Sequence, residues 1–405
     1  MTSAEVAARF LLAVAVAVVA ARVLGWAAVR LRQPRVVGEV LAGIMLGPSL
    51  LGALWPAATE YLFPVQVMPG LKGLAQLGLV LFMFLVGVEL DPGLLRGRGK
   101  TVAYVELGSL VLPFGLGVVS ALWLYPRFGT GTDRLSFVLF IGVAMAITAF
   151  PVLVRILQDT GLAGTPVGAV AVAAAALDDV TAWCLLAGAV AVTASTGPGE
   201  VLVVAGLAAA YVLVMVLVVR PVLARAGSVS LPVAVAVALL SAWATEQIGV
   251  HAVFGAFVAG AVMPGERSVR ARLEEQLTTV TTSVLLPVFF VVVGVSVRID
   301  RLNSLYLWGV TAFVVLVATV GKMVGATGGA LLSGSSRRDA LTLGVLMNTR
   351  GLTEIVILTV GLELGVIDTT MFSIGVVMAL TTTVIASPLL RLVRPDVAAA
   401  VPRRA

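Results

Sequence analysis

Long apolar runs, separated by short polar or basic segments, follow one another along the whole chain. A helix needs about 20 apolar residues to cross a bilayer, and runs of this length recur from one end to the other. The pattern predicts an all-α polytopic membrane protein with thirteen transmembrane helices. We expect these spans near residues 5–28, 36–52, 71–90, 101–125, 135–158, 165–193, 199–219, 231–248, 250–264, 279–297, 307–333, 339–364 and 368–390.

Basic residues concentrate in every second loop between these spans. Eighteen lie in the loops that follow odd-numbered spans or in the C-terminal tail, and five lie in the opposite loops. Because basic loops stay on the cytoplasmic side, we predict an external N-terminus and a cytoplasmic C-terminus. The chain is thus expected to be a multi-pass protein of the cell membrane.

Three short patterns recur in the same order at an interval of seven spans. "GEVLAGIMLGPS" is echoed by "GAFVAGAVMPGE", "LFMFLVGVELD" by "VFFVVVGVSVRID", and "GVAMAITAFPVLVRIL" by "GVLMNTRGLTEIVIL". An odd interval makes a helix and its copy cross the bilayer in opposite directions. Spans 1–6 and 8–13 therefore form the two inverted-topology six-helix repeats of a secondary transporter, with span seven as connector.

Two of these spans carry helix-breaking or polar residues at equivalent depths. Proline lacks an N–H and its ring clashes with the preceding turn, so span five should break close to Phe150. The repeat-related span twelve is interrupted by polar residues. The alternative is that both spans contain ordinary kinks, but the matching positions in the two repeats favour crossed broken helices. The backbone carbonyls freed at the breaks, together with the Thr148 hydroxyl, could then coordinate a cation. The residues concerned are Thr148, Ala149, Phe150, Pro151, Asn348, Thr349, Arg350 and Gly351.

Adjacent acids, Asp178 and Asp179, lie about halfway along span six. Ionisable residues inside a membrane are expensive to bury and are functional candidates by default. Lys322, one of only three lysines, lies inside span eleven and is the expected partner of one acid. A site of two acids and a lysine can bind protons or a monovalent cation alternately. That competition is sufficient for exchange.

Other acids in the spans receive a structural interpretation. Arg350 and Glu354 are four residues apart in span twelve, and we expect them to pair on one helix face as a supporting element. Glu39, Glu89 and Glu106 are interpreted as interface or funnel residues.

Composition excludes several classes of protein. With 405 residues, 60% hydrophobic and 12% charged, the chain could not hide its apolar surface in a soluble core. One cysteine and one histidine exclude a disulfide framework and a Cys- or His-based metal cluster, and no cofactor is expected. The net charge of +6 is explained by topology rather than by nucleic-acid binding.

The motifs "GEVLAGIMLGPSLLG", "TAFPVLVRIL", "AAAALDDVTAW", "GKMVGA" and "NTRGLTEIVIL" together resemble the monovalent cation/proton antiporter-2 family over nearly the whole chain. The resemblance is greatest to bacterial sodium/proton antiporters and to the membrane part of plant cation/H⁺ exchangers. It implies that Asp179 carries the ion and that Asp178 pairs with Lys322. The adjacent aspartates imply electrogenic exchange of Na⁺ or K⁺ for protons. No nucleotide-binding domain of the kind found in glutathione-gated members is expected.

The resemblance also implies a homodimer whose core moves like an elevator. Spans 1–3 and 8–10 would form the dimer domain, and spans 4–6 and 11–13 the moving core. The corresponding segments are residues 1–95 and 229–302 for the dimer domain, 96–196 and 303–393 for the core, 197–228 for the connector and 394–405 for a cytoplasmic tail.

Three other functions are alternatives to exchange. A cation channel or uniporter without proton coupling needs no titratable switch in its pathway. An intramembrane aspartyl protease places its acids on two facing helices rather than side by side on one. A signalling or scaffold protein that has kept a transporter fold would differ from an exchanger only in not transporting ions, which a transport assay would reveal.

Overall fold

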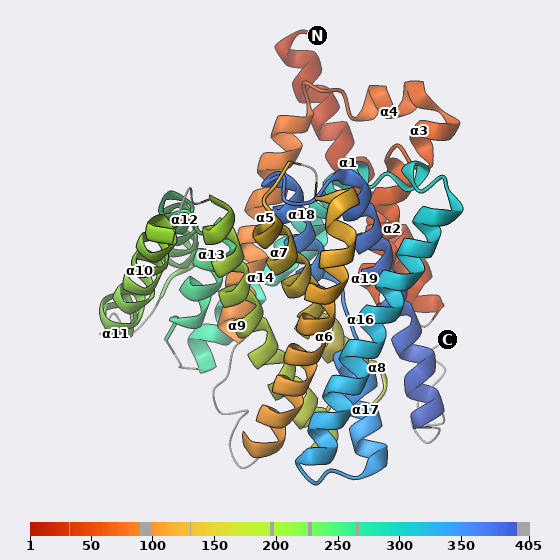
Figure 1. The fold of residues 1–405 in the computed structure, drawn as a ribbon. Helices are drawn as coiled ribbons and strands as arrows, with labels where there is room; N and C mark the ends of the chain where they lie inside the picture. Colours follow the sequence, from red (N-terminus) through yellow and green to blue (C-terminus); the bar gives the residue numbers. More distant parts are fainter. Residues whose placement is uncertain are drawn as a thin grey trace. The chain divides into compact units, whose positions relative to one another are not determined.

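The structure is a computed structural model, and it describes residues 1–31, 33–89, 99–129, 131–194, 198–225, 229–264 and 267–394. Within these ranges every regular element is helical and no strand is present (Figure 1). The prediction of an all-α chain is confirmed. The predicted segment boundaries at 95/96, 196/197 and 228/229, and the tail beyond Arg394, lie outside the described residues.

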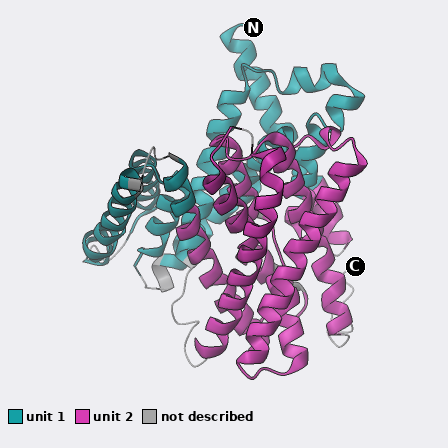
Figure 2. Ribbon diagram, in the orientation of Figure 1, with its two compact units in different colours: residues 1–23, 39–91, 187–296 teal, residues 24–38, 92–186, 297–405 magenta. Residues whose placement is uncertain are grey.

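The chain divides into two compact units (Figure 2). Unit 1 comprises Met1–Val23, Glu39–Asp91 and Ala187–Ser296, and unit 2 comprises Leu24–Gly38, Pro92–Leu186 and Val297–Ala405. Each unit therefore combines segments from both halves of the sequence.

Unit 1 contains most or all of eleven helices among the described residues. They are α1 (Ser3–Arg30), α2 (Arg35–Leu46), α3 (Leu51–Leu54), α4 (Pro56–Leu62), α5 (Met68–Glu89), α10 (Pro198–Val214), α11 (Arg220–Arg225), α12 (Leu231–Ile248), α13 (Ala252–Ala261), α14 (Arg267–Val280) and α15 (Leu286–Ser296). Single π-helical segments join α10 to α11 and α14 to α15, at Met215–Val219 and Thr281–Leu285.

Unit 2 contains most or all of eight α-helices among the described residues. They are α6 (Gly99–Phe128), α7 (Arg134–Ala146), α8 (Phe150–Asp159), α9 (Pro166–Ala194), α16 (Leu305–Leu332), α17 (Arg337–Met347), α18 (Leu352–Glu363) and α19 (Thr369–Val393).

Ten helical segments of the described chain are long and apolar enough to cross a membrane. The other three predicted spans correspond to α13, to the α7–α8 pair and to the α17–α18 pair, each of which is short or interrupted. None of these three contains a continuous helix of at least 18 residues, because α7–α8 and α17–α18 are interrupted and α13 is short. The multi-span character is established, and thirteen stays a prediction.

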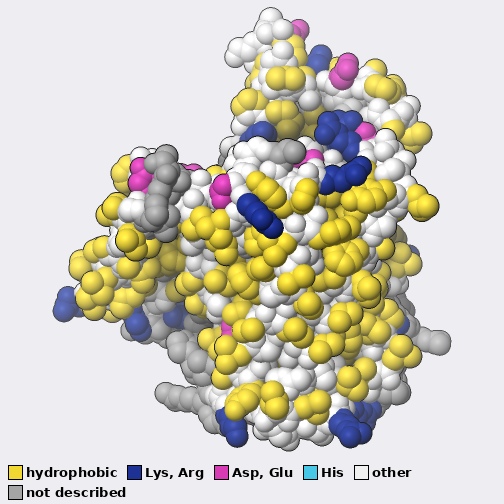
Figure 3. Space-filling view, viewed as in Figure 1, with side chains coloured by type: hydrophobic (Ala, Val, Ile, Leu, Met, Phe, Trp, Pro, Cys, Tyr) yellow, Lys and Arg dark blue, Asp and Glu magenta, His cyan; other side chains and the backbone are white. Residues whose placement is uncertain are grey.

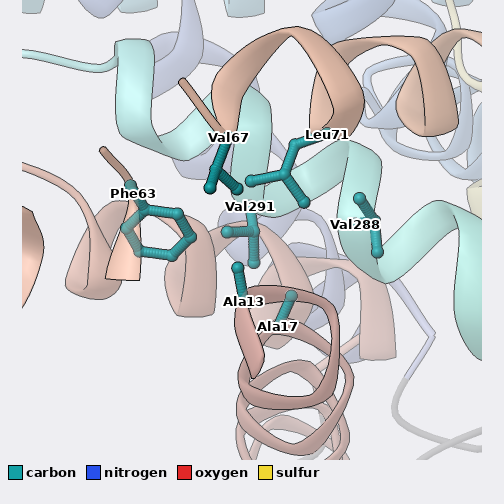
Figure 4. Close-up of a cluster of buried hydrophobic side chains, with 7 residues drawn as sticks. All are labelled: Ala13, Ala17, Phe63, Val67, Leu71, Val288 and Val291. Atoms are coloured by element: carbon teal, nitrogen blue, oxygen red, sulfur yellow. The ribbon is translucent and has the colours of Figure 1, made fainter. Parts of the chain in front are cut away.

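The interior of unit 1 is built by apolar side chains from distant parts of the sequence. One buried cluster joins Ala13 and Ala17 of α1, Phe63 and Val67 before α5, Leu71 of α5, and Val288 and Val291 of α15 (Figure 4). The small alanines of α1 allow close packing, and the branched valines of α15 fill the space between the segments.

Helix starts in unit 2 are capped by their own sequence. Asp133 Oδ1 accepts hydrogen bonds from the backbone N–H groups of Leu135 (2.9 Å) and Ser136 (3.0 Å) at the start of α7. Ser304, Ser336 and Asp368 accept equivalent bonds from the first turns of α16, α17 and α19. These caps satisfy N–H groups that would otherwise lack a partner at the helix end.

Glycine allows α6 and α16, two long helices of unit 2, to pack with their backbones in contact. A Cβ atom added to Gly325 would collide with the carbonyl oxygen of Gly108, and one added to Gly108 would collide with that of Gly325. Small residues at helix contacts are typical of membrane proteins, where packing rather than hydrophobicity drives helix association.

The outward faces of these helices are apolar. Leu107, Val111, Leu316 and Val324 are more than half exposed. The face seen in Figure 3 is covered mainly by hydrophobic side chains over α6 and α16, with Lys and Arg gathered toward its ends. This distribution suits helices that contact lipid along their middle and water at their ends.

We predict that Gly325→Ala destabilises the protein while Gly328→Ala does not. The added methyl at 325 must displace the backbone of α6, and overpacking of this kind costs about 1–3 kcal/mol. Gly328 lies one turn away on α16 with nothing within 4 Å of an added Cβ, so it is a matched control. Thermal unfolding of both variants in detergent checks this. Equal melting temperatures for the two variants would contradict the close approach of α6 and α16.

Candidate ion-binding site

Both predicted helix interruptions are present in unit 2. Residues 147–149 are non-helical between α7 and α8, and residues 348–351 between α17 and α18. The first break lies directly before Phe150, close to the predicted position. Pro151 is the second residue of α8, where a missing N–H is harmless and the fixed φ favours starting a helix.

The two breaks cross and bond to each other. The N–H of Ala149 donates to the carbonyl oxygen of Thr349 (3.0 Å), and Thr148 Oγ1 donates to the carbonyl oxygen of Met347 (3.0 Å). Gly351 permits the close approach, because a Cβ there would lie 2.6 Å from Cγ2 of Val152. Backbone groups released from each helix are therefore partly satisfied by the other break, as the membrane interior requires.

Lys322 of α16 joins the first break to α9. Its Nζ donates to Asp178 Oδ2 (3.1 Å) and to Thr148 Oγ1 (2.7 Å). Asp178 Oδ2 also accepts the backbone N–H of Thr148 at 2.6 Å. All three side chains are fully buried. A charge-assisted network of this kind holds three separate chain segments in one arrangement.

The Thr148 hydroxyl is already engaged in this arrangement. It accepts from Lys322 and donates to Met347 O, so its single proton is used and one lone pair remains. The sequence suggested Thr148 as a cation ligand, and the structure adds a second task, which is to connect Lys322 to the end of α17.

Arg350 stabilises the end of α7 from the second break. Its guanidinium donates to the carbonyl oxygens of Ala144 (2.7 Å) and Met145, and it contacts Glu354 Oε2 at 2.5 Å. The last carbonyls of a helix carry partial negative charge, which a cation offsets. Arg350 therefore caps α7 while Glu354, in the first turn of α18, supplies the balancing charge.

The geometry of this pair differs from the expected helix-face pair. Arg350 lies before the first residue of α18, Leu352, so only Glu354 is helical. The Arg350–Glu354 ion pair is therefore not a pair of residues on the face of one helix. Thr383 of α19 fixes the Arg350 backbone by accepting its N–H at 3.1 Å and donating to its carbonyl oxygen.

Asp179 follows Asp178 on α9 and is only 1% exposed. Neighbouring residues on a helix point about 100° apart, so the two carboxylates face different surroundings. Glu106 of α6 is a third buried acid of this region, because Thr181, one turn after Asp178, donates to its Oε1 at 3.2 Å. The interpretation of Glu106 as a funnel or interface residue stays a prediction, to which the structure adds this contact with α9. Its nearness to α9 could not be read from the sequence.

Several buried polar atoms near the crossing have no hydrogen-bond partner among the described residues. They include Asp178 Oδ1, Oδ1 and Nδ2 of Asn348, Arg350 Nε and Glu354 Oε1. Oxygen atoms in this condition can be satisfied by water or by an alkali cation, which takes oxygen ligands. In the described part of the chain, no group of three or more His, Cys, Asp or Glu side chains could hold a metal ion.

Comparison with known proteins identifies the family. Residues 12–393 match the family model described as "Sodium/hydrogen exchanger, transmembrane". The chain belongs to the sodium/hydrogen exchanger family.

Individual relatives align over nearly the whole chain. It is 42% identical over 388 residues to "Na(+)/H(+) antiporter NhaS4" of Synechocystis sp., covering 93% of this chain and 94% of that protein. It is 38% identical to "Cation/H(+) antiporter 18" of Arabidopsis thaliana, covering 93% of this chain, and 35% identical to "K(+)/H(+) antiporter 1" of Saccharomyces cerevisiae, covering 90%. It spans about half the length of the plant and yeast proteins, 48% and 44%.

A solved exchanger structure has the same fold. The sodium proton antiporter MjNhaP1 of Methanocaldococcus jannaschii superimposes with a TM-score of 0.65 at 17% identity, covering 97% of this chain and 99% of that one. The likeness confirms the antiporter fold. The region matched by the sodium/hydrogen exchanger model includes both breaks, Asp178, Asp179 and Lys322.

We predict that Lys322→Ala lowers the thermal stability of this exchanger markedly. Removing one member of a buried ion pair leaves the other charge uncompensated, a change that costs about 3–5 kcal/mol. Unfolding followed by intrinsic fluorescence in detergent measures the effect, with Lys100→Ala, at an exposed lysine, as control. Adding Asp178→Asn to Lys322→Ala should recover part of the loss. Equal stability of Lys322→Ala and the parent protein would mean that the ion pair is incidental.

Proposed function

We propose that the chain is a secondary active antiporter that exchanges a monovalent cation, Na⁺ or K⁺, for protons across the cell membrane by alternating access. The observation that carries the proposal is the fully buried network of Asp178, Lys322 and Thr148 beside Asp179 at two crossed helix breaks. Relatives named as Na⁺/H⁺, K⁺/H⁺ and cation/H⁺ antiporters support it. It acts as a transporter rather than as an enzyme.

Asp179 is the proposed carrier of the cation or the proton. It is buried, ionisable and adjacent to Asp178, whose Oδ2 is occupied by Lys322 and the Thr148 N–H. A proton and an alkali cation both neutralise one carboxylate, so they compete for it. The remaining oxygens suited to the cation are Asp178 Oδ1, Asn348 Oδ1 and freed backbone carbonyls at the crossing.

The broken helices serve the site in two further ways. Ala149, Phe150 and Pro151 start α8 so that its N-terminal end meets the carboxylate of Asp178 through the Thr148 N–H. Thr349, Arg350, Gly351 and Glu354 hold the second break against the first. The positive N-terminal end of α8 lies near Asp178, and Arg350 caps the negative C-terminal end of α7. Both arrangements lower the free energy of burying these charges.

The two units suggest how access alternates. We assign the dimer domain to residues 1–95 and 229–302, and the moving core to residues 96–196 and 303–393, with 197–228 as connector. Unit 2 holds the whole acid–base network, which is what a core that carries its ion by an elevator movement requires. We further propose a homodimer, as the family resemblance implies. From the distribution of basic loops we propose that the N-terminus lies outside and the C-terminus in the cytoplasm.

Electrogenic exchange follows if more than one proton is exchanged per cation. A negative-inside potential is worth about 2.3 kcal/mol per charge per 100 mV, and an electrogenic exchanger would use it to expel cations. A cation channel or uniporter would lack this coupling.

We predict that Asp179→Asn abolishes exchange while leaving the protein folded. Asn keeps the shape and loses the charge that proton and cation share. Purified protein in liposomes with an internal pH dye, challenged with Na⁺, K⁺ and Li⁺ in turn, gives the measurement. Asp300→Asn, which removes a surface carboxylate paired with Arg298, is the control and should keep activity.

Cation-driven proton movement retained in Asp179→Asn would remove this residue from the ion site. Cation flux through the parent protein without any proton movement would instead support the channel and contradict exchange altogether.

A further inference from the structure

A groove of about 690 Å³ runs along the surface of unit 2 between α6 and α16. Its walls are large apolar side chains, among them Leu107 and Val111 of α6 and Val324 of α16, which are all more than half exposed. Of the described side chains that line it, Tyr104 is the one with a polar group. Because the chain belongs to a transmembrane family, an exposed apolar groove on these helices faces the lipid.

No described segment of the chain fills the space beside two glycines of the groove. Gly115 of α6 and Gly328 of α16 line it, and an added Cβ at either position would meet nothing within 4 Å. They differ from Gly108 and Gly325, whose missing side chains let the two backbones touch. Glycine in a helix interior is less stable than alanine, and packing of the described chain does not require it at 115 or 328. The space that they leave is open to a molecule outside the chain.

The groove has the length and the position of a lipid chain. From Tyr104 to Val119 it follows α6 for about 22 Å, at 1.5 Å per residue. This exceeds one leaflet's share of a hydrocarbon core about 30 Å thick. Tyr104 and Trp123, near the two ends of α6, are 41% and 54% exposed and lie about 28 Å apart along the helix axis. This is the spacing of the two aromatic belts of a membrane, so the groove begins at one interface and runs through that leaflet.

Basic side chains lie at the interface where the groove begins. Lys100 is one turn before Tyr104, and its Nζ lies 5.9 Å from the centre of the Tyr104 ring. Arg337 is exposed and is the first residue of α17, a few residues after the end of α16. A Cβ on Gly329 would collide with the Tyr104 carbonyl oxygen, so this end of α16 is adjacent to the start of α6.

The charge at this end favours an anionic headgroup. Asp339, the acid in the first turn of α17, is paired with Arg394. Figure 3 shows Lys and Arg side chains at the edge of the apolar face where α6 and α17 begin in Figure 1. Lys100 and Arg337 belong to the basic loops that the sequence predicts to be cytoplasmic, and basic residues at that surface attract anionic lipids.

We propose that the groove between α6 and α16 is a binding site for one anionic phospholipid. One acyl chain lies along Gly115 and Gly328, and the phosphate meets Lys100 and Arg337. Val324 follows Lys322 by two residues, about 200° around α16. The lipid therefore occupies the face of α16 turned away from the ion-binding network. The proposal goes beyond antiport and does not depend on the coupling or the direction of transport.

Native mass spectrometry of the purified protein tests this site. Delipidated protein in detergent is mixed with equal amounts of phosphatidylglycerol, which is anionic, and phosphatidylcholine, which is zwitterionic. We expect the parent protein to retain one phosphatidylglycerol per chain in preference to phosphatidylcholine. Gly115→Leu adds a side chain to the open side of the groove and should abolish retention. Lys100→Gln and Arg337→Gln should each lower the preference for phosphatidylglycerol about fivefold.

Gly309→Leu and Lys72→Gln are matched controls. Gly309 is a glycine of α16 that does not line the groove and has nothing within 4 Å of an added Cβ, and Lys72 is an exposed lysine of α5 in unit 1. Both variants should retain lipid as the parent protein does. Equal retention of the two lipids by the parent, or parent-like retention in Gly115→Leu, would mean that bulk lipid alone covers the groove and would overturn the proposal.

A second readout covers the case in which Gly115→Leu folds poorly. In thermal unfolding, added phosphatidylglycerol should raise the melting temperature of the parent protein and of Gly309→Leu, but not that of Gly328→Leu. Without added lipid, Lys100→Gln should melt with the parent. An equal rise in all of these variants would contradict a lipid in the groove. If Gly328→Leu were monomeric where the parent is dimeric, the occupant would be a second copy of the chain, and the lipid assignment would be rejected.

Discussion

Lys322 Nζ and Asp178 Oδ2 meet at 3.1 Å inside unit 2, where neither side chain is exposed. This pair connects α16 to α9, and through the Thr148 hydroxyl and N–H it also connects both to the first helix break. A buried ion pair contributes little net stability compared with apolar packing, but it penalises every arrangement in which the partners separate. The pair therefore sets which arrangement of the three segments is populated.

The helix crossing is stabilised by complementary partial charges and not only by packing. Arg350 caps the carbonyl end of α7, Thr148 contacts the carbonyl of Met347 at the end of α17, and Glu354 lies in the first turn of α18. Each helix end thus meets a group of opposite sign. Arg350 and Glu354 are tied to each other through Glu354 Oε2. Asp178 has one oxygen without a described hydrogen-bond partner, which can respond to an added ion.

Much of this arrangement was predictable because membrane burial makes polar residues conspicuous. Asp178, Asp179, Lys322 and both breaks stood out as polar or helix-breaking positions in apolar runs. The sequence also suggested a pairing of Arg350 with Glu354, though on a shared helix. Periodicity cannot locate a helix start to within two residues, and α18 begins only at Leu352. The contacts of Glu106 with Thr181 depend on how α6 packs against α9, which local pattern does not encode. The count of thirteen spans stays a prediction, because three of the predicted spans are short or interrupted helices without a continuous apolar stretch.

The central claim is that one buried set of carboxylates binds either protons or an alkali cation. Titration calorimetry of the purified protein with Na⁺, in two buffers of different ionisation enthalpy, counts the protons released on binding. The account predicts proton release on cation binding, strongly reduced in Asp179→Asn. Saturable Na⁺ binding with the same heat in both buffers would mean that no protons leave, and it would contradict the account.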